Sequence, residues 1–132
     1  MTDVLFPMQD QGRVTLPGSD APFAVPSSQV VTLQEVIVDA ASGDLAIYRF
    51  RFLAPAIAKA GGTMDFEASI ADMQHLCDSY AVLQIMPPMP AATQIIVAFS
   101  DIALPFGETN PDATQFFMAF KIEDGLCVLE PY

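Results

Sequence analysis

Arg49 and Arg51 form the polar pair with the clearest chemical use in this sequence. They lie two positions apart in the run Leu45–Leu53, where they alternate with aromatic residues as in a strand. Strand residues two positions apart point to the same side, about 7 Å from each other, so two guanidinium groups could hold a carboxylate or a phosphate. Cross-strand ion pairs with neighbouring acids are the simpler alternative. We therefore treat Arg49 and Arg51 as a candidate anion-binding pair and keep the ion-pair interpretation beside it.

The one histidine, His75, limits the catalytic chemistry that the sequence could support. Residues two positions apart on a helix point in different directions, so His75 could not activate the thiol of Cys77. The sequence contains no phosphate loop, no dinucleotide fingerprint and no G-x-S-x-G motif. Asp72, His75 and Asp78 could form a surface metal site, but a solvated helix face explains their spacing more simply. We predict that the protein is not an enzyme and needs no cofactor and no metal.

Cys77 and Cys127 are expected on two elements that face each other. A turn at Asp124-Gly125 would pair Ile122 with Cys127, so that Cys127 points toward the core. Cys77 falls on an apolar helical stripe with Phe66, Ile70, Met73 and Tyr80. A disulfide between them would close a loop of about 50 residues and stabilise the fold by roughly 4 kcal/mol. We predict this bond and, with it, a periplasmic or secreted protein; two separate buried thiols in a cytoplasmic protein are the alternative.

The run Met86-Pro87-Pro88-Met89-Pro90 is the second unusual feature. Proline favours an extended conformation, and methionine adapts to apolar partners. If this segment is exposed, Met86 and Met89 are candidate contacts for a partner protein. If it packs against the domain, it is only a connecting loop.

The first 29 residues are expected to form an irregular arm. They contain Pro7, Pro17, Pro22 and Pro26, and they lack the basic start and apolar core of a signal peptide. A short edge strand at 13–16 fits the apolar residues between these breakers.

Residues 30–132 are expected to form a single α+β domain. Val30–Val38 and Leu45–Leu53 predict a hairpin with a turn at 39–44. Pairing Val38 with Leu45 keeps the apolar residues together but places Glu35 opposite Tyr48. A slip by one residue would instead pair Glu35 with Arg49 and scatter the apolar set. We favour the first register.

The remaining elements complete the fold prediction. A helix is expected to begin near a cap at Thr63 and to end at Leu83–Met86, before the prolines. Strands are expected at Thr93–Ser100, Thr114–Glu123 and Leu126–Leu129. We predict an α+β fold: an antiparallel sheet of about five strands, with one main α-helix packed on one face.

The charge balance restricts the class of partner. The chain has 16 acidic and 5 basic residues in 132, a formal net charge of −11. Nucleic acids would be repelled, whereas a basic protein would be attracted. The longest aliphatic run, Ile95–Phe99, is far shorter than the ~20 residues of a membrane span. We expect another protein as the partner, preferably a basic one, with no nucleic acid and no membrane insertion.

Several short segments also carry a resemblance to known sequences. They are Val25-Pro26-Ser27-Ser28, Tyr48-Arg49-Phe50-Arg51-Phe52, Ala54-Pro55, Asp72-Met73, Leu76-Cys77, Phe106-Gly107-Glu108, Pro111-Asp112, Gln115-Phe116-Phe117 and Ile122-Glu123-Asp124-Gly125-Leu126-Cys127. Over residues 25–132 the chain resembles a family of small, uncharacterised, mostly exported alphaproteobacterial proteins. The resemblance implies export and a Cys77–Cys127 bond, but it implies no activity because the function of the family is unknown.

These observations lead to one functional prediction and one alternative. We predict a non-catalytic periplasmic module that binds another protein. The alternative is a small-molecule anion-binding protein, or a small enzyme, that uses the strand face of Arg49 and Arg51.

Overall fold

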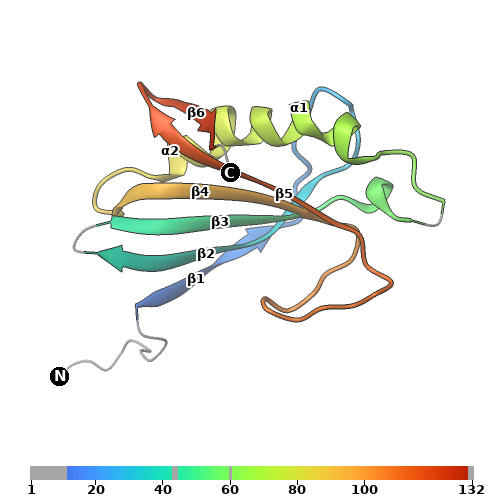
Figure 1. Ribbon diagram of the computed structural model, residues 1–132, viewed down its shortest axis with the longest axis horizontal. Helices are drawn as coiled ribbons and strands as arrows, with labels where there is room; N and C mark the ends of the chain where they lie inside the picture. Colours follow the sequence, from blue (N-terminus) through green and yellow to red (C-terminus); the bar gives the residue numbers. More distant parts are fainter. Residues whose placement is uncertain (1–11, 43–44, 60, 131–132) are drawn as a thin grey trace.

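The computed structural model describes residues 12–42, 45–59 and 61–130. They form one six-stranded sheet with a single helical layer across one face (Figure 1). The strands are β1 (Arg13–Ser19), β2 (Thr32–Ser42), β3 (Leu45–Leu53), β4 (Ala91–Ser100), β5 (Gln115–Glu123) and β6 (Leu126–Leu129). This confirms the predicted α+β fold with one main helix on one face of the sheet.

The strands lie in the sheet in the order of the sequence, from β1 to β6. Every neighbouring pair is antiparallel except β3 and β4, which run parallel in the middle of the sheet. A parallel pair needs a long crossover connection, and the helix supplies it here. The sheet is therefore mostly antiparallel, with a parallel centre that the strand pattern alone does not indicate.

The part of the N-terminal arm that the structure describes contributes a full edge strand. β1 begins at Arg13 and ends at Ser19, three residues beyond the predicted segment 13–16, and pairs with β2. Residues 1–11 of the arm lie outside the described residues.

The helical layer runs without interruption from Phe66 to Gln84. It consists of α1 (Phe66–Leu76), a π-helical turn (Cys77–Ala81) and α2 (Val82–Gln84), and a short 3₁₀ turn (Pro55–Ile57) precedes it. The cap is Asp65, whose carboxylate accepts a hydrogen bond of 2.8 Å from the amide of Ala68, rather than Thr63. An Asp at this position also suits the positive end of the helix dipole. The predicted end near the prolines is confirmed.

The core lies between this helix and the central strands. Tyr48, Phe50 and Phe52 of β3 point toward the helix, and each is 1% exposed. On β4 the matching residues are Ile95, Val97 and Phe99, all fully buried. Because successive strand residues alternate between faces, Arg49 and Arg51 must point to the opposite side of the sheet.

The hairpin of β2 and β3 has a register that differs from both predicted ones. Val38 lies opposite Tyr48, whereas the sequence pattern favours Leu45 as its partner. β2 continues to Ser42, so most of the predicted turn at 39–44 belongs to the strand. A longer strand shifts all the pairs between the two segments.

A break in the ladder adds a further shift that neither predicted register contains. The register shifts between Leu33 and Glu35, as at a β-bulge, so Leu33 reaches the core while Glu35 points to the other face. Glu35 lies opposite Arg51, not beside Tyr48 or Arg49 as predicted. A bulge adds a residue to one strand only, and a pattern of simple alternation cannot show it.

The predicted disulfide is confirmed. Cys77 in the π-helical turn and Cys127 on β6 are bonded, with 6.1 Å between their Cα atoms. Two helix side chains hold the backbone of the same residue: Asp78 accepts from the amide of Cys127 at 2.8 Å, and Gln74 donates to its carbonyl at 2.9 Å. The predicted pairing of Ile122 with Cys127 is also observed.

Candidate functional site

The face of the sheet opposite the helix, here called the open face, carries the predicted arginine pair. The loop 101–114, between β4 and β5, folds beneath this face (Figure 1). The loop ends are tied together, because the amide of Asp101 donates to the carbonyl of Thr114 at 3.1 Å and the carboxylate of Asp101 accepts from the amide of Thr114 at 2.8 Å. The open face is therefore partly covered by a loop with fixed ends.

Both predicted arginines are engaged in cross-strand ion pairs with β2. Arg51 pairs with Glu35 and also donates to the carbonyl of Leu104 in the loop at 2.9 Å. Arg49 pairs with Asp39, and Arg13 of β1 pairs with the same carboxylate at 2.7 Å. These contacts are the cross-strand ion pairs that the sequence predicts as the simpler alternative to an anion site. An incoming anion would have to compete with the carboxylates of Glu35 and Asp39.

The ionisation of Asp39 is controlled by its two arginine neighbours. Burial alone would raise the pKa of this carboxyl group, but the hydrogen bonds and positive charges of Arg13 and Arg49 outweigh burial and hold the pKa below its ordinary value of 3.8. Asp39 is therefore a carboxylate throughout the neutral range, and it can bridge β1 and β3.

Phe106 is the residue of this site that sequence reasoning missed. Its ring lies beneath three guanidinium groups, with its centroid 5.0 Å from Arg13 and 5.4 Å from both Arg49 and Arg51. Such cation–π contacts hold the tip of the loop against the sheet. The only local signal is an aromatic residue directly before Gly107, whose positive φ of 88° marks a turn.

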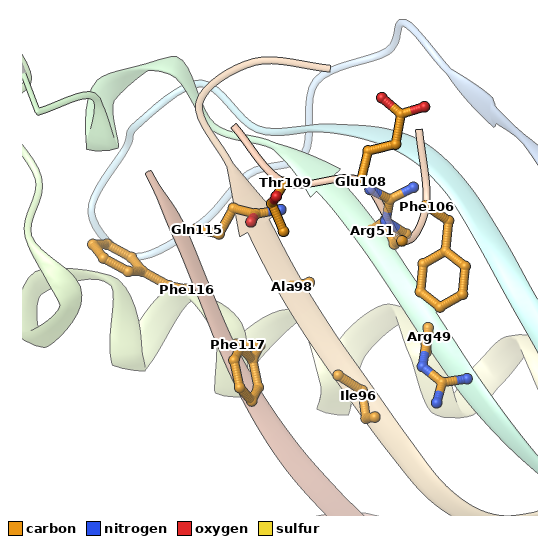
Figure 2. Close-up of a pocket in the computed structure, with 11 residues that line it drawn as sticks. Arg49, Arg51, Ile96, Ala98, Phe106, Glu108, Thr109, Gln115, Phe116 and Phe117 are labelled. Carbon is orange, nitrogen blue, oxygen red and sulfur yellow. The ribbon is translucent and has the colours of Figure 1, made fainter. Parts of the chain in front are cut away.

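A cleft of about 370 Å³ opens between the loop and the strands. Figure 2 shows Ile96 and Ala98 of β4 between Phe117 on one side and the arginines with Phe106 on the other. The rest of the lining consists of Gly107, Glu108, Thr109, Gln115 and Phe116. Phe117 is 61% exposed and Phe106 is 39% exposed, so the cleft presents aromatic surface to solvent.

The candidate partner contacts Met86 and Met89 lie away from this cleft. They belong to the loop before β4, whereas the cleft-forming loop follows β4. Met86 is 59% exposed, but Met89 is partly buried and packs against the core. Of the two, Met86 is the one whose side chain is mostly open to solvent.

The helix acids have roles that differ from the predicted solvated face. Asp72 is fully buried and accepts hydrogen bonds from Gln29 at 2.7 Å and from the amide and hydroxyl of Ser27. It therefore fastens the segment before β2 to the helix. His75 is exposed, while Asp78 binds β6. Within the described ranges, no cluster of three or more His, Cys, Asp or Glu side chains could hold a metal ion.

The fold and the cleft define a class of protein: a small α+β domain with one helical layer, a disulfide between the helix and the sheet, and a partly covered open face. The chain belongs to a family of unknown function (DUF6497), which it matches over residues 8–132. This match begins closer to the N-terminus than the resemblance over 25–132 indicates. No curated protein and no solved structure matches the chain. None of the helices in the described part is long and apolar enough to cross a membrane.

Proposed function

We propose that this protein is an exported, non-catalytic module that binds another protein, preferably one with a basic surface. One observation carries the proposal: the five basic side chains all have intramolecular partners. The arginines bind Glu35 and Asp39, as described above. Lys121 pairs with Glu123 at 3.3 Å, and Lys59 donates to the carbonyl of Pro111 at 3.0 Å.

Internal use of the basic groups leaves the acidic excess on the surface. The chain has 16 acids for 5 bases, and few of the acids are needed to neutralise those bases. The exposed acids of the described residues are Asp20, Asp65, Glu67, Glu108, Asp112, Glu123 and Asp124. A surface of this kind accelerates the encounter with a basic partner, and added salt slows that encounter.

Exposed apolar residues could supply the desolvated part of the contact. Met86 is 59% exposed, and Phe117 and Leu126 are exposed to a similar degree. Interfaces typically combine such apolar residues with a polar rim. The variant Met86→Asp tests whether the exposed side chain of Met86 contacts the partner.

The disulfide supports the exported location. Bonds of this type form and persist in oxidising compartments such as the periplasm and the extracellular space, and they are rare in the cytosol. The disulfide therefore supports the proposal of a periplasmic or secreted protein.

The experiment is affinity capture from an extract of exported proteins, followed by measurement of binding rates with the purified partner. We expect the association rate constant to fall at least tenfold between 50 mM and 500 mM salt, an order of magnitude typical of steered association. A partner whose association rate is independent of salt would contradict the charge-based mechanism. Binding that Met86→Asp leaves unchanged would exclude Met86 as a contact.

The cleft beside Arg49 and Arg51 is the specific observation that favours the second candidate, a small anionic ligand. Titration calorimetry with short-chain carboxylates and with inorganic phosphate tests it. Binding that is lost in Arg49→Gln would favour an anion site, and the protein-binding proposal would then give way if no protein partner is captured.

A further inference from the structure

We infer that the open-face cleft is the docking site for a basic protein segment that inserts a bulky apolar side chain between Phe106 and Phe117. This inference rests on the proposed function, because it names the site and the chemistry of the partner. It makes the cleft, rather than the exposed Met86, the central contact.

The apolar surface of the cleft is the first support. Phe117 is 61% exposed although it lies within the strand β5, and Phe106 faces it across Ile96 and Ala98 (Figure 2). Monomeric proteins rarely expose a large contiguous apolar patch unless the patch binds a partner or a ligand. A cleft of about 370 Å³ is near the lower end of the range for ligand pockets and has room for a bulky side chain.

The charge around the cleft is the second support. Arg51 pairs with Glu35, and Arg49 shares the carboxylate of Asp39 with Arg13, so these three arginines and two acids together carry one net positive charge. Glu108 lines the cleft and is exposed. Asp112 in the same loop is exposed as well. A lysine or arginine next to the inserted side chain would therefore meet Glu108, the acid that lines the cleft.

The net charge of the whole chain argues against other occupants. A second copy of the chain also has a formal charge of −11, so two copies would repel each other over long range. Nucleic acids and anionic lipid surfaces would be repelled for the same reason. A basic segment is the occupant that the charges favour.

The partner segment is expected to lie across the sheet rather than to extend it at β6. Addition of a strand needs free backbone groups along an edge. At Cys127 both groups are occupied, the amide by Asp78 and the carbonyl by Gln74. On the open face, in contrast, the side chain of Phe117 is mostly exposed.

The loop that forms one wall of the cleft is held before any partner arrives. The carbonyl of Leu104 accepts hydrogen bonds from Arg51 at 2.9 Å and from Gln34 at 2.8 Å, and the ring of Phe106 contacts three guanidinium groups. A wall that is already ordered lowers the entropy cost of binding. We therefore expect little movement of the loop when the cleft is filled.

A displayed library of random 12-residue peptides tests the inference on the full chain. Selection against the wild-type protein is expected to enrich peptides with lysine or arginine on both sides of Leu, Phe, Ile or Met. Phe117→Ser is expected to weaken binding of the enriched peptides about tenfold or more, as loss of a central apolar contact does. Leu83→Ser is the matched control, because Leu83 is 62% exposed but lies in α2. It should bind like wild type.

Amide chemical-shift mapping with the most enriched peptide then locates the contact. Shifts at Ile96, Ala98, Phe106 and Phe117 support the inference. Enrichment of acidic or uncharged peptides, enrichment of none, or shifts centred on Met86 would overturn it.

The two proposals fail in different ways. If a basic protein is captured but binds wild type and Phe117→Ser equally well, the docking site is wrong and the proposed function stands. If no protein binds in a salt-dependent manner and the library yields no basic peptide, both are wrong.

Discussion

Arg51 of β3 and Glu35 of β2 lie opposite each other on the open face, and their side chains form an ion pair. The Arg51 side chain is 10% exposed and the Glu35 side chain 22% exposed, so the pair is largely shielded from water. The pair can form only in the observed hairpin register, because a slip by one residue would move one partner to the other face. It therefore links the register of the sheet to the charge of the candidate site.

Glu35→Leu is expected to destabilise the protein, by about 3 kcal/mol, because it leaves the guanidinium of Arg51 shielded and without its carboxylate. Urea unfolding measures the loss. The double variant Glu35→Leu with Arg51→Met should recover much of it, since both charges are then removed. The control is Glu123→Leu in the exposed pair with Lys121, which should change stability by less than about 1 kcal/mol. A neutral or stabilising Glu35→Leu would contradict the observed register.

Phe106→Leu is expected to loosen the loop 101–114, because it removes the aromatic ring beneath the three guanidinium groups and keeps an apolar side chain. Each cation–π contact contributes on the order of 0.5–1 kcal/mol at an exposed site. Amide hydrogen exchange should become faster at residues 102–113 and stay unchanged in the core strands. Phe117→Leu is the control, and it should leave exchange in the loop as in wild type. Equal protection in both variants would argue against a clamping role for Phe106.

The double variant Cys77→Ser with Cys127→Ser is expected to lose about 4 kcal/mol of stability, as loss of a cross-link that closes a 50-residue separation should. Thiol titration of the unfolded, unreduced wild-type protein should detect no free thiol. Two free thiols would contradict the bond, and with it the support for an oxidising compartment.

The ion pairs of Asp39 predict a specific dependence of stability on pH. The pKa of Asp39 in the folded protein lies below its ordinary value of 3.8, so the folded state favours the carboxylate. Its contribution to stability should be fully present above a pH of about 4 and be lost as the pH falls through the folded-state pKa. The difference in unfolding free energy between wild type and Asp39→Asn should thus be constant near neutral pH and shrink in acid. A difference that grows on acidification would contradict the lowered pKa.

The elements that could be predicted from the sequence are those with local signals. The aromatic alternation at Tyr48, Phe50 and Phe52 predicts β3 and its buried face, and Asp124-Gly125 predicts the last hairpin. The helical stripe and that hairpin together predict the Cys77–Cys127 bond, because each places its cysteine toward the core.

The errors arise where distant parts of the chain decide the structure. The bulge between Leu33 and Glu35 is stabilised by pairing with β3 and has no local signature. Asp72 looks like a solvated helix residue, and only contacts with Ser27 and Gln29, more than 40 residues earlier, allow it to be buried. Phe106 belongs to the site because the loop folds back beneath the sheet, which no local pattern indicates.

The position of β4 between two exposed loops has a consequence for how many molecules the protein can hold at once. Met86 precedes the strand, and the cleft lies along its second half. Ala91 and Ala98 are seven residues apart on β4, or about 23 Å at the rise of a strand. A short peptide segment centred on the cleft would leave Met86 uncovered. Two different molecules could therefore bind at the same time, one at Met86 and one in the cleft. The strand β4 between them would set their spacing.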